Sequence, residues 1–330
     1  MDDSIRGKRV LFFGLETMGY EKKILRKMTE LGAVVDYYSE RPASSTVGKI
    51  IIKFFPALLR KKTEKYYLRV IQECKDEIYD IIFIMKCDSP TRKILTELKN
   101  TFPDAQLRLH MWDSMANIIG IEEKLDLFDR ITSFDRQDCL KHPEFCFRPL
   151  FYADEFTCKN TEIVYDISFC GTIHTDRYSI LENIRRQCEE NGMKFYGYYY
   201  LQSWIVYYFL KFTNKDYRHV KKSEFKYESI GSDEVNKLFQ TSVAIVDIQH
   251  PRQSGLTMRT IETIGAGKKL ITTNRDIVNY DFFNPSNICV IDRSAPKIPK
   301  EFFTAQYEEL SASVKEKYTL ERWVIDVLTM

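Results

Sequence analysis

The chain has 330 residues, of which 44% are hydrophobic and 29% are charged, and its formal net charge is only +2. This length exceeds one typical hydrophobic core, so two domains are expected, and the near-neutral charge argues against a nucleic-acid-binding protein. The eight cysteines form no Cys-x-x-Cys pair and have no histidine cluster near them. This pattern argues against zinc fingers and indicates reduced thiols in a cytoplasmic protein.

The first half of the chain alternates strand-like and helix-like segments. Short apolar runs predict strands at 10–13, 34–38, 81–85, 107–111 and 130–134, and the segments between them predict helices at 20–31, 49–74 and 91–99. This alternation is typical of one doubly wound α/β domain over residues 1–150. Glycine is sparse after the first strand, around Gly14, so the dinucleotide fingerprint Gly-x-Gly-x-x-Gly is missing and a dehydrogenase is disfavoured.

The alternation restarts after a predicted linker at 149–160. Strands are expected at 166–170, 194–197, 243–248, 270–273 and 288–291, and helices at 177–191, 204–211, 233–240 and 256–265, with a mostly helical tail from 301. These segments predict a second doubly wound α/β domain over residues 151–330, with a crevice between the two halves and the final helix packing back on the first domain. The aromatic runs 198–200 and 204–209 are expected in the core rather than as a carbohydrate platform.

The most informative stretch is 243–274, which reads as strand, loop, helix and strand. Ligands of parallel sheets bind at the carboxyl ends of strands, beside helix N-termini. Gly255, after Ser254, would let a phosphate approach the free N–H groups of the helix. Glu262 follows seven residues later, about 10 Å along the helix, where a carboxylate suits a ribose diol. Arg259 would add positive charge toward a phosphate; the alternative is an ordinary amphipathic helix with Glu262 in solvent.

Three further residues are candidates for the phosphate end of a ligand. Gly171 ends a predicted strand, and Arg177 could reach a pyrophosphate as a fixed cation, although a surface arginine at a helix start is the alternative. His250 follows a strand end close to the same loop. It would lie near a leaving phosphate, or simply bind the backbone.

An enzyme that activates a hydroxyl for attack needs a base, and Asp113 is the preferred candidate. It follows the predicted strand 107–111, and Asp88 holds the equivalent position after 81–85. Either aspartate could instead cap the following helix. His110 is a weaker candidate for the base.

The resemblance to a known family rests on several runs. The run Asp247-Ile-Gln-His-Pro-Arg-Gln-Ser-Gly-Leu-Thr-Met-Arg-Thr-Ile-Glu resembles the donor-binding segment of GT-B glycosyltransferases. It is most similar to the CgeB-like group associated with bacterial capsule and lipopolysaccharide synthesis. The run Phe169-Cys-Gly-Thr-Ile-His-Thr-Asp-Arg-Tyr resembles the first strand and loop of the same domain. Looser matches are Trp112-Asp113-Ser114, Ser133-Phe134-Asp135 and Arg148-Pro149-Leu150-Phe151.

The resemblance implies a GT-B fold, in which two Rossmann-like doubly wound domains face a central crevice. It implies a glycosyltransferase that moves a sugar from a nucleotide-diphosphate donor to a hydroxyl of a surface glycan or lipid-linked acceptor. No metal and no further cofactor are expected. The implied catalytic residues are Asp113, His250 and Arg177. The implied donor-binding residues are Gly171, Arg177, Ser254, Gly255, Leu256, Thr257, Arg259 and Glu262.

The sequence departs from the family at one position. Related retaining enzymes carry a Glu-x7-Glu pair in this segment; the second glutamate matches Glu262, but Ser254 stands in place of the first. Retention and inversion therefore both stay open. The replacement also favours an alternative, a non-catalytic GT-B nucleotide-binding or assembly module, and a sugar-nucleotide epimerase is a second alternative.

The segment from Lys49 to Lys62 is basic and apolar. It would contact anionic lipid at the inner face of the membrane, where a lipid-linked acceptor is presented. The alternative is a partly buried helix at the edge of a domain.

Overall fold

The structure of the protein is a computed structural model that describes residues 3–16, 19–41, 56–159 and 161–330. The chain divides into two compact units. Unit 1 comprises Met1–Leu150, Arg252–Gly255 and Leu320–Met330, and unit 2 comprises Phe151–Pro251 and Leu256–Thr319.

Unit 1 is built on a sheet of six parallel strands in the order β2-β1-β3-β4-β5-β6. The strands are β1 (Arg9–Gly14), β2 (Val34–Ser39), β3 (Ile81–Met85), β4 (Gln106–Met111), β5 (Arg130–Ser133) and β6 (Cys146–Phe147). The helices are α1 (Tyr20–Glu30), α3 (Pro56–Cys74), α4 (Arg92–Thr101), α5 (Arg136–Lys141) and α12 (Leu320–Thr329).

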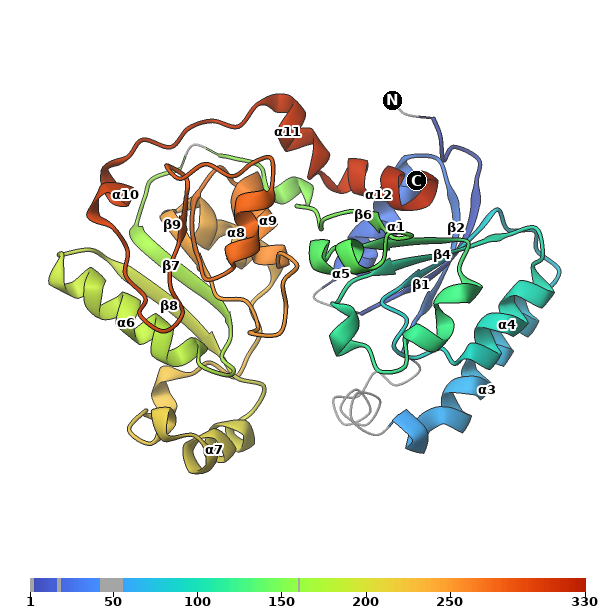
Figure 1. Cartoon of the computed structure of the whole chain (residues 1–330), viewed down its shortest axis with the longest axis horizontal. Coiled ribbons are helices and arrows are strands. Elements are labelled where there is room, and N and C mark those ends of the chain that lie inside the picture. The colour runs from blue at the N-terminus through green and yellow to red at the C-terminus, as the bar shows by residue number, and fades with distance from the viewer. Residues whose placement is uncertain (1–2, 17–18, 42–55, 160) are drawn as a thin grey trace. The chain divides into compact units, whose positions relative to one another are not determined.

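Other elements cover both faces of this sheet, and the side chains of each strand alternate between the two faces. On one face, Leu11 and Phe13 pack with apolar residues of α3 and α4 (Figure 1). On the other face, Phe83 meets the buried Trp323 of α12, with ring centroids 6.3 Å apart. Two covered faces explain why β3 reads as an unbroken apolar run.

Unit 2 is built on five parallel strands in the order β11-β10-β9-β7-β8. The strands are β7 (Tyr165–Thr172), β8 (Phe195–Tyr200), β9 (Ser242–Asp247), β10 (Lys269–Thr272) and β11 (Ile288–Val290). The helices are α6 (Arg177–Glu190), α7 (Trp204–Thr213), α8 (Ser232–Gln240), α9 (Met258–Gly265), α10 (Lys300–Thr304) and α11 (Ala312–Lys317). Apolar residues of α6 and α10 pack on one face of the sheet, and α8 and α9 contact β9 and β10 (Figure 1).

The two sheets share one topology. In unit 1 the chain runs from β1 to β2 on one side and then to β3 on the other side of β1, and in unit 2 it runs likewise from β7 to β8 and then to β9. Each sheet therefore has a switch point, between β1 and β3 in unit 1 and between β7 and β9 in unit 2. In open α/β sheets of this kind, ligands bind outside the carboxyl ends of the strands at the switch point.

Backbone geometry marks the same two places. Among the described residues, the non-glycine residues with positive φ are Lys86, Cys87 and Thr175. Lys86 and Cys87 directly follow β3, and Thr175 lies just after β7. A left-handed backbone at a non-glycine residue costs free energy and is found most often at functional sites. The switch points are therefore the places to look for function.

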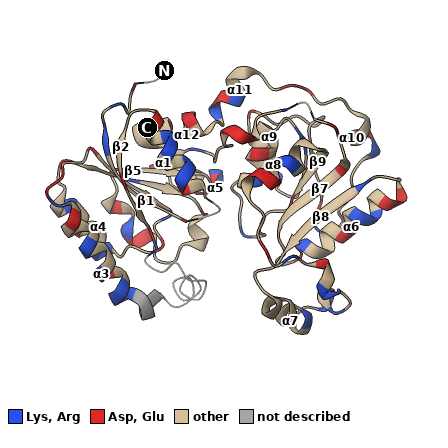
Figure 2. Ribbon diagram, turned by 180° about the vertical axis from the view of Figure 1, so that it is seen from behind, with Lys and Arg blue, Asp and Glu red and all other residues tan. Residues whose placement is uncertain are grey.

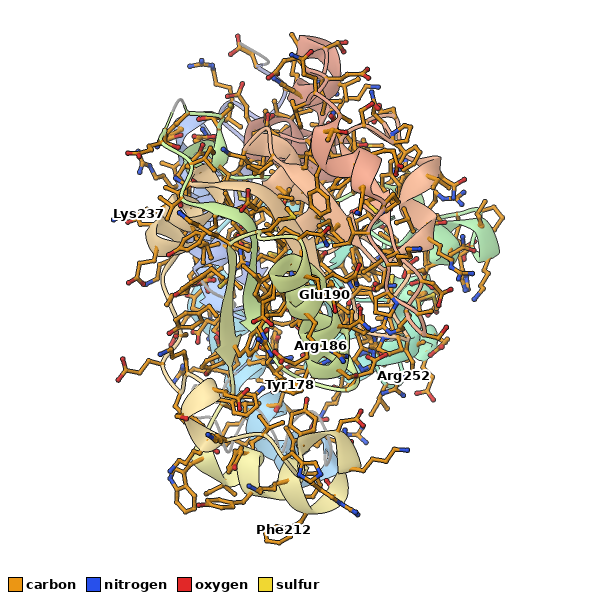
Figure 3. The ribbon with its side chains drawn as sticks, turned by 90° about the vertical axis from the view of Figure 1, so that its left-hand side faces the viewer. Tyr178, Arg186, Glu190, Phe212, Lys237 and Arg252 are labelled. Atoms are coloured by element: carbon orange, nitrogen blue, oxygen red, sulfur yellow. The ribbon has the colours of Figure 1, made fainter. Side chains whose placement is uncertain are left out.

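One expectation about α7 holds only in part. The helix forms where it was predicted and Tyr207 is buried in the core, but Trp204 is 56% exposed, Ile205 61% and Phe209 65%. Phe212, which follows on the same helix, points away from the ribbon (Figure 3). Figure 2 shows α7 mostly in tan, whereas α4 and α6 carry red and blue segments along their length.

Two other expectations concern helix starts. The helix was expected directly after Gly255, but α9 begins at Met258 with Thr257 as its N-cap. Of the predicted basic segment, residues 49–55 lie outside the described residues, and α3 begins at Pro56.

Candidate functional site

Arg177 spans the switch point of unit 2. It is the first residue of α6, and its Nη1 donates to the carbonyl oxygen of Thr172 at the end of β7, at 2.6 Å. Its Nη2 donates to the carbonyl oxygen of Ile248, just beyond β9. The residue is only 9% exposed, and its Nε has no hydrogen-bond partner among the described residues. Burial lowers the pKa of Arg177 to about 10, so the guanidinium is still charged at neutral pH.

Gly171 leaves room for this guanidinium. A Cβ atom at Gly171 would lie 3.2 Å from Cζ of Phe169 and 3.6 Å from Nη1 of Arg177. Gly171 and Arg177, which were predicted to act together, therefore lie close to each other in the structure. The arginine also lies over the Phe169 ring, with Cζ 5.9 Å from the ring centroid.

A second arginine, which the sequence did not single out, reaches the same loops. Arg293 follows β11, and its Nη2 donates to the carbonyl oxygen of Gln249 at 2.7 Å. It also forms an ion pair with Asp176, at the start of α6. Nothing in the run around Arg293 resembles a motif; only the pairing of β11 with β10 brings it to this edge of the sheet.

Two histidines face each other at the switch point. The ring centroids of His174, after β7, and His250, after β9, are 5.5 Å apart. Burial, with the nearby charge of Arg177, lowers the pKa of His174 to about 3, so its ring is neutral at physiological pH. Positive charge and imidazole groups from the loops after β7, β9 and β11 thus gather at the carboxyl ends of β7 and β9, beside the strained Thr175. Such a cluster suits an anionic ligand that also carries hydrogen-bonding groups.

The start of α9 is tied to the same end of the sheet. Asp247 ends β9 and accepts hydrogen bonds from the hydroxyls of Thr257 at 2.5 Å and Thr260 at 2.6 Å. Thr257 also accepts from the backbone N–H of Thr260. Leu256 is buried, so only its backbone could face a ligand. The aspartate therefore fixes where the N-terminus of α9 lies, a position that favours negative charge.

Glu262 and Arg259 pair with each other. The carboxylate of Glu262 has no exposed surface and forms a salt bridge with Arg259 one turn earlier. Cζ of Arg259 lies 5.9 Å from the centroid of the Phe239 ring. The alternative with Glu262 in solvent is wrong. Because the pair is buried, a ligand that used either side chain would have to replace this contact.

Ser254 and Gly255 lie in unit 1. The Ser254 hydroxyl donates to Oδ1 of Asp135 at 2.5 Å, and a Cβ atom at Gly255 would lie 2.4 Å from Cε2 of Phe134. Only glycine fits against this ring without a shift. Ser254 and Gly255 therefore contact two residues of the run Ser133-Phe134-Asp135.

Unit 1 carries a network of charges at its own switch point. Asp88 follows β3 and forms ion pairs with Arg41 and, at 3.7 Å, with Lys86. Nζ of Lys86 also lies 3.0 Å from Oδ2 of Asp113, which follows β4. Although burial opposes it, the hydrogen bond from Arg41 and the charge of Lys86 lower the pKa of Asp88 to about 2. Glu40 lies behind this network and is fully buried.

The carboxylate of Asp113 also accepts local hydrogen bonds. Its Oδ1 accepts from the backbone N–H of Ser114 at 3.0 Å and from the amide of Asn117 at 2.9 Å. His110 is enclosed, with no exposed surface and with its ring centroid 4.9 Å from that of Trp323. Burial lowers the pKa of His110 to about 3. Of the base candidates, Asp88 and Asp113 thus lie in the charged network at the strand ends, and His110 does not.

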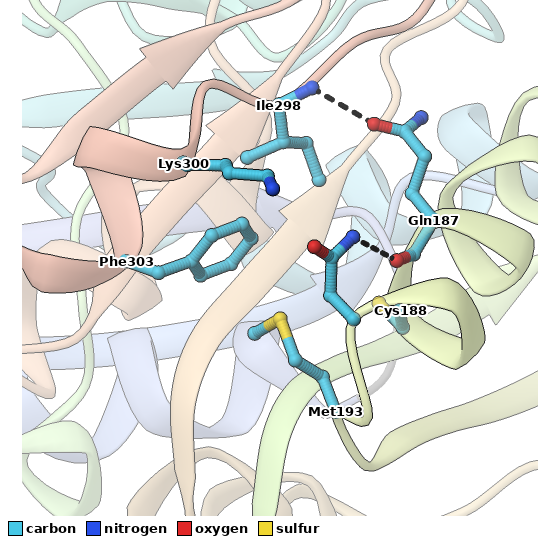
Figure 4. Close-up of a pocket in the computed structure, with 7 residues that line it drawn as sticks. Gln187, Cys188, Met193, Ile298, Lys300 and Phe303 are labelled. Carbon is cyan, nitrogen blue, oxygen red and sulfur yellow. Dashed lines mark hydrogen bonds between the residues drawn. The ribbon is translucent and has the colours of Figure 1, made fainter.

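A well-defined cavity in unit 2 lies elsewhere. It has a volume of about 200 Å³ and lies between the end of α6 and the segment that enters α10, beside Cys188, Met193 and Phe303 (Figure 4). Gln187 lines it and accepts from the backbone N–H of Ile298 at 3.1 Å. Met193 precedes β8, so the cavity is at the amino end of the strands and contains none of the predicted donor-binding residues.

No protein-family model matches the sequence, and no curated protein matches it. The structure is similar to a glycosyltransferase from Rickettsia africae ESF-5, with 11% identity over 98% of this chain and 99% of that chain and a TM-score of 0.57. It is similar to Anabaena HepE in complex with UDP-glucose, with 11% identity over 97% and 98% of the two chains and a TM-score of 0.61. It is also similar to the UDP-GlcNAc 2-epimerase from Methanocaldococcus jannaschii, with 10% identity over 98% and 99% and a TM-score of 0.53.

The fold is therefore α/β of the GT-B type, with two Rossmann-like units of parallel strands, and the predicted fold class is confirmed. At 9–12% identity these likenesses concern the fold alone. A shared fold does not fix a function, which depends on the residues of the site.

Proposed function

We propose that the protein is a glycosyltransferase that moves a sugar from a nucleotide-diphosphate donor to an acceptor hydroxyl. The observation that carries the proposal is Arg177, a buried cation whose guanidinium joins the ends of β7 and β9 at the switch point. Arg293 adds a second cation from the loop after β11. HepE, a protein of the same fold, binds UDP-glucose.

Charge balance is the chemical reason for this assignment. When the bond between sugar and diphosphate breaks, negative charge grows on the leaving diphosphate, and fixed cations that are already in place stabilise it. In the proposal Arg177 and Arg293 supply this charge, and the N-terminus of α9 at Thr257 adds its N–H groups. No metal ion is required for this scheme, and His250 would donate a hydrogen bond to the leaving phosphate.

The other predicted residues take supporting roles in the proposal. Glu262 binds the donor ribose after its contact with Arg259 is replaced, and Arg259 then turns toward a phosphate. Unit 1 binds the acceptor, with Asp113 as the base if the reaction inverts the sugar. The resemblance to the CgeB-like group supports a surface glycan or a lipid-linked molecule as the acceptor.

The first experiment is a thermal-shift screen of the full chain against UDP, GDP and their common sugar conjugates. A ligand at a hundred times its Kd raises the free energy of unfolding by about 2.7 kcal/mol, which is easily measured. Release of nucleoside diphosphate is then followed with the best donor, with and without candidate glycan acceptors. Binding of a nucleotide sugar with acceptor-dependent release supports the proposal. If no nucleotide sugar binds, or if a bound donor is never turned over, the protein is not a glycosyltransferase of this kind.

An epimerase is the second candidate, because an epimerase with the same fold covers as much of the chain as the glycosyltransferases do. The two functions differ in what they need. An epimerase converts its sugar nucleotide with no acceptor present, whereas a transferase needs the acceptor hydroxyl. Proton NMR of the donor after incubation with the protein alone separates them.

A further inference from the structure

We propose that α7 and the basic segment after it form a docking surface for an anionic lipid bilayer. The apolar part of this surface comprises the exposed side chains of α7: Trp204, Ile205, Tyr208, Phe209 and Phe212. Their spacing places them along one side of a helix. Phe212 is 81% exposed and points away from the molecule (Figure 3).

The opposite side of α7 is also apolar and packs on unit 2. Tyr207 is buried and donates its hydroxyl hydrogen to the carbonyl oxygen of Val220 at 3.0 Å. Val206 and Leu210 pack partly buried against the same core. A helix that is apolar all round is normally enclosed on all sides. Since α7 is covered on one side only, the other side is available to a partner.

The contrast with α6 shows that this exposure is unusual for the unit. The outer side of α6 carries charged residues such as Arg186 and Glu190 (Figure 3). Scattered exposed apolar side chains are normal, but five on one short helix form a patch, and patches mark sites of interaction.

The charge beside the patch selects the partner. Between Lys211 and Glu228 the chain has six Lys or Arg residues and three Asp or Glu residues. One of the acidic residues, Glu224, is engaged, because it accepts from the Tyr178 hydroxyl at 2.7 Å. Nζ of Lys222 lies 5.9 Å from the centroid of the Trp204 ring, so positive charge adjoins the aromatic patch directly. Aromatic side chains bordered by Lys and Arg are typical of surfaces that insert shallowly into anionic membranes.

A second copy of the chain fits this surface less well. In a two-fold dimer the same patch meets itself, so the basic segments of both copies would face each other and repel. The length of α7 also limits the mode of contact. Ten residues extend about 15 Å, half of a bilayer core, and among the described residues no helix is long and apolar enough to cross a membrane. The helix would therefore lie along the membrane surface.

The test uses the full chain and sedimentation with large vesicles. One set contains phosphatidylcholine alone, and the other contains equal parts of phosphatidylcholine and phosphatidylglycerol. We expect the wild-type protein to sediment with the anionic vesicles only. Phe209→Ser/Phe212→Ser should weaken this binding by about tenfold or more, because the inserted apolar area is lost. Lys221→Glu/Lys222→Glu should remove the preference for anionic lipid.

The matched control is Ile78→Ser/Leu140→Ser, which changes two apolar residues of unit 1 that are 83% and 62% exposed. This variant should bind vesicles like the wild type, and circular dichroism checks that all variants are folded. Trp204 gives a second readout: its fluorescence should shift to the blue with anionic vesicles, and the shift should be lost in Trp204→Phe.

Three results would overturn the proposal. The first is that the wild type does not sediment with anionic vesicles. The second is that the control loses as much binding as Phe209→Ser/Phe212→Ser does. The third is that the wild type binds no vesicles and is a dimer, which Phe209→Ser/Phe212→Ser converts to a monomer. None of these readouts needs a sugar donor. Failure of the docking surface and failure of the proposed glycosyl transfer are therefore distinguishable.

Discussion

Asp176 and Arg293 form a two-point ion pair, with Nε of Arg293 2.7 Å from Oδ2 of Asp176 and Nη2 3.1 Å from Oδ1. The pair joins the loop after β11 to the start of α6. Burial alone would raise the pKa of Asp176, but the hydrogen bond and charge of Arg293 lower it overall. The ion pair therefore holds the second cation of the switch point in a fixed position beside Arg177.

The first prediction concerns this arginine. Arg293→Ala should lower the affinity for UDP by tenfold or more, since a charge-assisted hydrogen bond contributes about 1.5–3 kcal/mol. It should also lower the free energy of unfolding by about 1–3 kcal/mol, because the bonds of Arg293 to Asp176 and to the carbonyl oxygen of Gln249 are lost. Isothermal titration calorimetry and urea denaturation measure the two quantities.

Arg275→Ala is the matched control for this prediction. Arg275 follows β10 and also pairs with an aspartate of unit 2, Asp292, but its side chain is 77% exposed. The control should bind UDP like the wild type. Equal affinities of Arg293→Ala and the wild type would show that this cation does not contact the diphosphate.

The second prediction concerns the buried pair of Glu262 and Arg259. Glu262→Ala should destabilise the protein by about 2–4 kcal/mol, because it removes the fully buried carboxylate that pairs with the Arg259 guanidinium, whose side chain is only 16% exposed. Arg259→Met/Glu262→Met should recover most of this loss, since apolar residues can replace a buried ion pair at little cost. Urea denaturation followed by circular dichroism tests both variants. A Glu262→Ala protein as stable as the wild type would contradict the described pair.

This prediction changes how a ribose contact has to be tested. Loss of activity in Glu262→Ala would not separate a binding role from a loss of folding. Glu262→Gln keeps the shape and one hydrogen-bond acceptor of the side chain. Its affinity for UDP, compared with that for a 2′-deoxy analogue, reports on the ribose contact itself.

The third prediction concerns Gly265, the last residue of α9. A Cβ atom there would lie 2.4 Å from Cγ of Tyr152, whose hydroxyl donates to the carbonyl oxygen of Lys315. Alanine is the better helix former by about 1 kcal/mol, but overpacking a buried contact costs about 1–3 kcal/mol. Gly265→Ala should therefore destabilise the protein.

Gly231→Ala serves as the control. A Cβ atom at Gly231, the N-cap residue of α8, meets no atom closer than 3.9 Å, so this variant should lose no more than about 1 kcal/mol, from the preference for glycine over alanine at an N-cap. Thermal melting of both variants gives the comparison. A Gly265→Ala protein that melts at or above the wild-type temperature would mean that the Tyr152 ring moves without cost.

The sequence predicted the fold because its signal is local. The run Ile81–Met85 is apolar at every position, as a strand covered on both faces must be, and β3 has those bounds. The segment 243–274 likewise reads as β9, α9 and β10, and only the start of the helix was misplaced. The reason is Thr257, which is a good N-cap, together with the contacts of Ser254 and Gly255 within unit 1.

The site was harder to predict because its partners are distant in sequence. Arg177 was identified from its place after a strand. Arg293 was missed, since its closeness to Asp176 depends on β11 pairing beside β10. The exposure of α7 was missed for a different reason. Apolar residues on all sides of a helix predict burial, and no local pattern tells which side the rest of the unit covers.

The fourth prediction concerns Glu40, at the switch point of unit 1. Its Oε1 accepts from the backbone N–H of Asp88 at 2.8 Å and of Ser89 at 3.3 Å, and the carboxyl is fully buried. Burial, reinforced by the charge of Asp88, raises the pKa of Glu40 to about 8 from its usual 4.5. Between these two values the folded protein keeps a proton that the unfolded chain has lost. The free energy of unfolding should therefore fall as the pH rises through this window.

Glu40→Gln removes this dependence, because glutamine does not titrate. Relative to the variant, the wild type should lose roughly 1.4 kcal/mol of stability for each pH unit within the window. Trp204→Phe is a suitable background, since the remaining tryptophans, Trp112 and Trp323, both lie in unit 1 and report its unfolding alone. The exposed Glu97→Gln is the control and should leave the wild-type pH dependence unchanged. If the free energy of unfolding depends on pH in the same way in the wild type and in Glu40→Gln, then Glu40 is charged in the folded protein. The network of Asp88, Lys86 and Arg41 would then compensate the charge of one more buried carboxylate.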